Sequence, residues 1–150
     1  LKRKINFNLS KDSNLLLCEN IIFGRTSMKE EFEKGYFSDF WNINIDKKLI
    51  HTEAINTGLF EKKYLNSFST LNNNSAVATI IIVGNKFLNN FNNLSETLTN
   101  NENTTSNYSQ WDNKLIVRLL SKDSYNLKFA IDKILSYFFE GSKIPKVWNI

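Results

Sequence analysis

The segment Ala76–Val83 constrains the fold most strongly, because eight consecutive residues are either alanine or β-branched and none is charged. A run of this length and type is typical of a strand that is buried on both faces. It is far too short to span a bilayer, which takes about 18–20 apolar residues. We therefore predict a central strand here, and other elements must cover both of its faces.

The first half of the chain shows the alternation that is typical of half-buried strands. Apolar and polar residues alternate over 5–9 and again over 41–45, which places the apolar side chains on one side of each strand. A further apolar stretch covers 15–23, and residues 46–48 resemble a hairpin turn that leads into 49–57. This half is predicted to form an antiparallel meander.

Two helices are predicted in the second half, because apolar residues there recur at steps of three and four. The first stripe spans 87–98, although most of the intervening residues are Asn, a poor helix former. The second stripe spans 127–138 and is the clearer one. Residues 121–124 offer possible N-caps for it, and Gly141 lies where a terminating glycine belongs.

The segments around these helices predict a further strand, a loop and a tail. The strand covers 114–120, whereas 100–113 is polar without regular apolar spacing and is predicted to be a mobile loop. The tail 144–148 is predicted to be extended, because the residue before Pro145 disfavours the helical region. The residues alone thus predict one α+β domain, because 150 residues is a usual length for a single domain.

Composition and charge argue against several function classes. Of the 19 basic residues, 16 are Lys and three are Arg, and they are spread among 15 acidic residues. Nucleic-acid binding instead favours Arg and a basic patch on one face. The single Cys excludes a disulfide scaffold and a zinc site of several thiolates. We expect a soluble protein of a reducing compartment that binds neither nucleic acid nor membrane.

Catalytic chemistry finds little support in the sequence. The five glycines are scattered, so no phosphate-binding loop is predicted. His51 is the one histidine, and Cys18 lies within an apolar stretch where a thiol usually acts as a small buried hydrophobe. A Cys–His nucleophile is therefore disfavoured. For His51 itself we prefer a hydrogen-bonded strand histidine over a metal ligand.

Acidic and arginine residues give the remaining candidates. Glu30, Glu31 and Glu33 form the densest acidic cluster, which is either a transient site for a divalent cation or, by preference, a solvated connector. Arg25 and Arg118 are unusual in a Lys-rich chain. Their guanidinium groups suit a fixed pairing with a carboxylate such as Glu30. A local structural ion pair and a functional role remain equal alternatives for both.

Three groups of residues, in order along the chain, resemble one known family. The first is 22–30, with its Gly-Arg-Thr and a following Glu; the second combines 49–53 with 76–80; the third combines 115–120 with the end of the chain, 144–148. Together they resemble the urease accessory proteins called UreD, or UreH in some bacteria. The chain departs from the family pattern where Lys replaces a usual Gly at position 29 and a usual Arg at position 146.

The resemblance implies a mostly β fold, in which stacked, helically wound antiparallel or mixed strands are accompanied by two α-helices in the C-terminal half. Family members are about twice as long as this chain. Residues 1–150 are therefore expected to be a single domain that forms the C-terminal portion of a longer UreD-like protein. The residues of the family motif are Gly24, Arg25, Thr26, Glu30 and Arg118.

The implied role is that of a non-enzymatic, cytoplasmic scaffold in a heteromeric complex. It would bind apo-urease and the accessory proteins UreF and UreG and would assist nickel insertion, with no tightly bound cofactor and nickel only in transit. Oxygen ligands suit such transit better than thiolates, and the residues expected along the route are Glu30, Glu53 and Asp39. The aromatic-rich C-terminus is expected to face UreF through Phe138, Phe139, Pro145 and Trp148.

Two other classes stay open. One is a β-rich binding module of unrelated lineage, such as a lectin-like domain. The other is a non-catalytic fragment of a hydrolase whose catalytic residues lie outside this chain.

Overall fold

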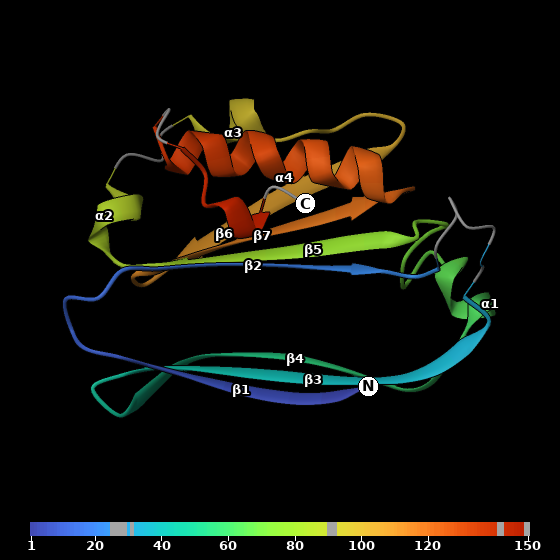
Figure 1. Ribbon diagram of the computed structural model, residues 1–150, viewed down its shortest axis with the longest axis horizontal. Coiled ribbons are helices and arrows are strands. Elements are labelled where there is room, and N and C mark those ends of the chain that lie inside the picture. Colours follow the sequence, from blue (N-terminus) through green and yellow to red (C-terminus); the bar gives the residue numbers. More distant parts are fainter. Residues whose placement is uncertain (25–29, 31, 90–92, 141–142, 149–150) are drawn as a thin grey trace. The chain divides into compact units, whose positions relative to one another are not determined.

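The computed structural model describes residues 1–24, 30, 32–89, 93–140 and 143–148 (Figure 1). The chain divides into two compact units. Unit 1 consists of Leu1–Ser13 and Gly24–Asn72, and unit 2 consists of Asn14–Phe23 and Asn73–Ile150. Each unit is built on a sheet of its own.

Unit 1 contains a three-stranded sheet in the order β1-β3-β4 (β1, Lys2–Leu9; β3, Lys34–Ile45; β4, Lys48–Glu61), followed by the short helix α1 (Lys62–Leu65). Strands β3 and β4 form the predicted antiparallel hairpin. Strand β1, however, pairs with β3 in parallel, so the predicted meander is wrong at this point. The intervening strand β2 belongs to the other sheet, and a chain that returns through such a crossover arrives parallel to its starting strand.

The turn between β3 and β4 has both central residues in the left-handed region, with φ of 46° at Asp46 and 66° at Lys47. This is the geometry of a type I′ turn, which favours Gly at the second position. We expect Lys47→Gly to raise the free energy of unfolding by about 0.5–1 kcal/mol, since relief of the left-handed strain exceeds the added entropy of the unfolded chain. Urea denaturation measures the change. The matched variant Lys48→Gly, at the first residue of β4, should be destabilised instead, and a loss of stability in Lys47→Gly would contradict the prediction.

Unit 2 contains a four-stranded antiparallel sheet in the order β2-β5-β7-β6 (β2, Leu15–Ile22; β5, Ala76–Val83; β7, Lys114–Ser121; β6, Thr104–Trp111). Helix α4 (Ser124–Phe138) lies across one face of this sheet (Figure 1). Strand β5 lies inside the sheet, and seven of its eight residues are buried. The prediction of a strand buried on both faces is confirmed.

The core of unit 2 lies between the sheet and α4. Alternate residues of β5 and β7 face the apolar stripe of the helix, and the principal members are Ile80, Ile82, Val117, Leu119, Leu127, Ala130, Ile134 and Leu135. Asp123 caps the helix, because its side chain accepts a 2.8 Å hydrogen bond from the backbone N–H of Asn126. After the helix, Glu140 adopts a φ of 48°; Gly141, predicted to terminate the helix, lies outside the described residues.

The predicted loop over 100–113 is wrong, because Thr104–Trp111 form β6. The sequence pattern is misleading here, since polar rather than apolar side chains occupy the buried positions. Thr104 and Ser121 are 2% and 0% exposed, and their hydroxyl groups are hydrogen-bonded at 3.0 Å. Ser106 is also buried, and its hydroxyl donates to the carbonyl of Thr99. Paired hydroxyl groups therefore replace the expected apolar alternation.

The stripe over 87–98 forms two helices of four residues each, α2 (Asn85–Leu88) and α3 (Leu94–Thr97), rather than one helix. Residues 90–92 lie outside the described part, and the many Asn residues explain the weak helical preference. The tail is also not fully extended, because Lys146–Trp148 form a turn of 3₁₀-helix. The predominantly β fold class is nevertheless confirmed by the two sheets. Among the described residues, no helix has the length and apolar character that a membrane crossing requires.

Candidate functional site

Polar and charged side chains gather on one face of the unit 1 sheet. Arg3 of β1 lies opposite Asp39 of β3, and Trp41 lies opposite Glu53 of β4. Residues two apart on a strand share a face, so Asp39 lies beside Trp41 and His51 beside Glu53. We call these five residues the polar strip.

Arg3 binds both oxygens of Asp39 in the polar strip. Its Nε donates to Oδ1 at 2.9 Å and its Nη2 donates to Oδ2 at 2.5 Å. The Asp39 side chain is 3% exposed and that of Arg3 is 35% exposed. The hydrogen bond to Asp39 is the main cause of a raised pKa for the Arg3 guanidinium. The guanidinium therefore stays protonated. Arg3 thus neutralises Asp39 and occupies one lone pair on each of its oxygens, which lowers the affinity of Asp39 for a cation.

His51 and Glu53 supply a nitrogen and an oxygen donor close together. His51 Nε2 lies 3.5 Å from Glu53 Oε2, and each side chain is 10% exposed. Imidazole and carboxylate are donor types that suit borderline divalent metal ions such as Ni²⁺. Over the described ranges, no group of three or more His, Cys, Asp or Glu residues could hold a metal ion. The pair alone thus suits brief binding rather than permanent storage.

Trp41 lies next to Asp39 on β3 and opposite Glu53 on β4 within the polar strip. The guanidinium of Arg3 lies 5.6 Å from the centre of its ring, and Phe7 contacts it edge-on at 6.4 Å. Trp41 is 4% exposed, and in the part of the chain that the structure describes its Nε1 has no hydrogen-bond acceptor. A buried N–H group of this kind is costly unless an acceptor reaches it. The strip therefore offers one buried donor beside its carboxylates.

Not all of the predicted route and motif residues join this strip. Asp39 and Glu53 do join it. They occupy diagonal positions of neighbouring strands, which places their Cα atoms about 7–8 Å apart. Glu30 is exposed, whereas Arg25 and Thr26 lie outside the described residues. Two further motif residues are placed elsewhere: Gly24 follows β2 with a φ of 93°, and Arg118 of β7 donates from Nη1 to Thr79 Oγ1 at 3.1 Å.

The predicted partner-binding residues lie at the end of unit 2, and they differ in exposure. Phe138 is 7% exposed and belongs to the core. Phe139 and Trp148 are half-buried with their rings 5.9 Å apart, and Pro145 is exposed. Sequence reasoning missed the exposed aromatic residues of α4, Tyr125 and Phe129, at 79% and 64% exposure. Their positions off the apolar stripe were the available signal.

Comparison with known proteins identifies the family. The family described as UreD urease accessory protein matches residues 1–149. A urease accessory protein UreD from Rhizobium leguminosarum bv. viciae is 30% identical over 155 residues, which cover 100% of this chain and 54% of that protein. One from Agrobacterium fabrum is 27% identical and is covered over 51% of its length. One from Granulibacter bethesdensis is 38% identical over 82 residues, or 55% of this chain and 34% of that protein.

The chain thus spans about half the length of the first two relatives, whereas those relatives match the whole of it. The match includes both units and every described strand. The chain therefore belongs to the UreD family of urease accessory proteins.

Proposed function

We propose that this protein acts in urease maturation as a non-catalytic scaffold, which binds apo-urease, UreF and UreG and assists the insertion of nickel. The observation that supports the role is the family match over residues 1–149. Relatives that match the whole chain are named urease accessory proteins. Because the chain belongs to this family, it is not of unrelated lineage, which argues against a lectin-like module. No described residue favours a hydrolase.

Nickel is the cargo in this proposal, and the polar strip supplies its contacts. We assign the first contact to Glu53 together with His51, whose donor atoms are 3.5 Å apart. Asp39 would contribute later, because Arg3 binds both of its oxygens. Glu30 remains part of the proposed route as an exposed carboxylate. Two donors bind a divalent ion weakly enough for its release, which a delivery protein requires.

Nickel loading of urease tests this role. We expect co-expression of the 150-residue chain with apo-urease, UreF and UreG in nickel-containing medium to raise the nickel content of the purified urease. The comparison is with the same co-expression without the 150-residue chain. The Glu53→Gln variant should lower this gain by about tenfold, since an amide is a poorer ligand than a carboxylate. Elemental analysis of the urease and its ureolytic activity are the two measurements.

The matched control is Glu33→Gln, because the Glu33 side chain in unit 1 is 75% exposed and lies 3.9 Å from Lys62. This variant should load urease as well as the unchanged chain does. If the chain adds no nickel to urease, the maturation proposal fails. If Glu53→Gln also loads urease as well as the unchanged chain does, the scaffold role survives and the assigned route is wrong.

A further inference from the structure

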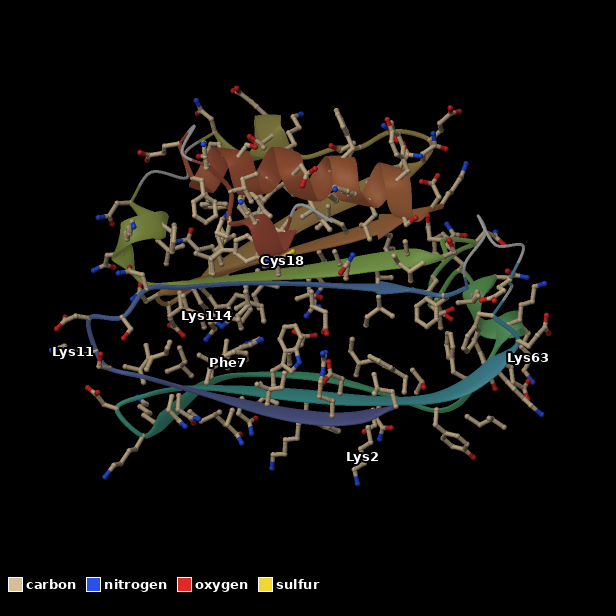
Figure 2. The ribbon with its side chains drawn as sticks, viewed as in Figure 1. Lys2, Phe7, Lys11, Cys18, Lys63 and Lys114 are labelled. Carbon is tan, nitrogen blue, oxygen red and sulfur yellow. The ribbon has the colours of Figure 1, made fainter. Side chains whose placement is uncertain are left out.

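A groove lies between the edge strand β2 and helix α4 in unit 2. Its volume is about 390 Å³, within the range of pockets that bind small groups. Figure 2 shows Cys18 on the side of β2 that faces α4. We call this feature the α4 groove; its lining residues that matter below are Cys18, Asn20, Tyr125, Lys128, Asp132 and Trp148.

The α4 groove combines aromatic rings with a carboxylate. Tyr125 and Trp148 supply the rings, and Asp132 supplies the charge. Lys128 also lines the groove, four residues before Asp132 on the same helix. Within the described ranges, the side chain of Asp132 makes no hydrogen bond or ion pair. A planar guanidinium fits such a set, because it stacks on aromatic faces and binds a carboxylate through two N–H groups.

The carboxylate of Asp132 acts on Cys18, which carries the single thiol of the chain. Burial raises the pKa of Cys18 to about 11, and the negative charge of Asp132 adds to the shift. The Asp132 carboxylate thus acts on the β2 side of the groove, where it can serve as the counter-ion of a bound cation.

Strand β2 adds a backbone feature to the same place. It is the first strand of the order β2-β5-β7-β6 and pairs with β5 on one side. Among the described residues, no strand pairs with its opposite edge, and proteins bind extended peptides at such edges. Cys18, Asn20 and Ile22 alternate along β2 and all line the groove, so alternate side chains of an added strand would project beside them.

We propose that the α4 groove binds an arginine side chain on an extended segment of a partner protein, which pairs with the edge of β2. The backbone of the segment provides hydrogen bonds to β2, while the guanidinium lies between the aromatic rings and contacts Asp132. This inference goes beyond the urease maturation role, because it concerns a different unit and a different ligand from the polar strip.

A short peptide tests the proposal on the 150-residue chain. The probe is a fluorescently labelled Val-Arg-Val-Arg-Val amide, and its matched control carries citrulline, a neutral isostere, in place of both arginines. We expect the arginine peptide to bind, as measured by fluorescence anisotropy, and the citrulline peptide to bind about tenfold more weakly. Asp132→Asn should weaken binding of the arginine peptide by a similar factor. The control Glu102→Gln, at an exposed loop position, should bind like the unchanged chain.

Alkylation of Cys18 locates the peptide, because Cys18 is the only cysteine. At pH 9, the arginine peptide should slow the reaction of Cys18 with iodoacetamide.

Tyr125→Ala, at a position 79% exposed, should weaken binding of the arginine peptide without affecting the fold, as circular dichroism would verify. Equal binding of the two peptides, full binding by Asp132→Asn, or unchanged alkylation of Cys18 would overturn the proposal. Equal protection by free arginine amide would overturn strand pairing. None of these outcomes alters the urease-loading result, so the two proposals fail separately.

Discussion

Replacing Leu127 with Ala is expected to lower the free energy of unfolding by about 2–5 kcal/mol. Leu127 is 0% exposed and lies on the side of α4 that packs against the unit 2 sheet. The substitution removes three heavy carbon atoms and leaves a cavity, because neighbours on β5 and β7 are held in place by their own strand pairing. Urea denaturation followed by far-UV circular dichroism measures the loss, since α4 is the longest helix.

The control for Leu127→Ala lies on the same helix. Phe129 is 64% exposed, so Phe129→Ala removes a larger side chain from water rather than from the core. We expect a change within about 0.5 kcal/mol for this variant. A loss of similar size in both variants would mean that α4 does not pack through the stripe that contains Leu127.

The second large effect is expected for Arg3→Gln in unit 1, with a loss of about 2 kcal/mol. The change leaves the Asp39 carboxylate, 3% exposed, without its cation. Removal of one partner of a fully buried ion pair costs about 3–5 kcal/mol, and the partial exposure of Arg3 reduces this cost because water can reach the site. Urea denaturation provides the measurement. Lys4→Gln, at an exposed position on the same strand, is the matched control and should change stability little.

A double variant separates the buried charge from lost packing. In Arg3→Gln combined with Asp39→Asn, two neutral amides replace the ions, so no uncompensated charge remains. We expect the double variant to be more stable than Arg3→Gln alone. A double variant less stable than both single variants would show that the contact of Arg3 with Trp41, rather than the ion pair, dominates the effect.

Local patterns predicted the elements whose burial follows a simple period. Strand β5 and helix α4 were evident from uninterrupted and helical apolar spacing, and the β3–β4 turn from its composition. Strand β6 was missed because its buried side chains are hydroxyl groups with partners such as Ser121 on β7, and a period of apolar residues cannot reveal these. The parallel pairing of β1 with β3 depends on β2 joining another sheet, which no local spacing encodes.

The candidate site was predictable to the extent that it depends on strand alternation. His51 and Glu53 are two apart, so their shared face could have been inferred, although a hydrogen-bonded strand histidine was preferred. Arg3 and Asp39 are 36 positions apart in sequence, and their pairing follows only from the β1–β3 register. The α4 groove was not predicted for the same reason, since it combines β2, α4 and the C-terminal turn.

The interleaving of the two units has a consequence for how the chain folds during synthesis. Strand β2 emerges from the ribosome well before its partner, because Leu15 pairs with Val83 and Ile22 with Ala76. Most of unit 1 is synthesised in between. Contacts of such high sequence separation form slowly, and the apolar residues of β2 stay without their sheet for that interval. Nascent β2 is therefore exposed to premature association until β5 has been synthesised.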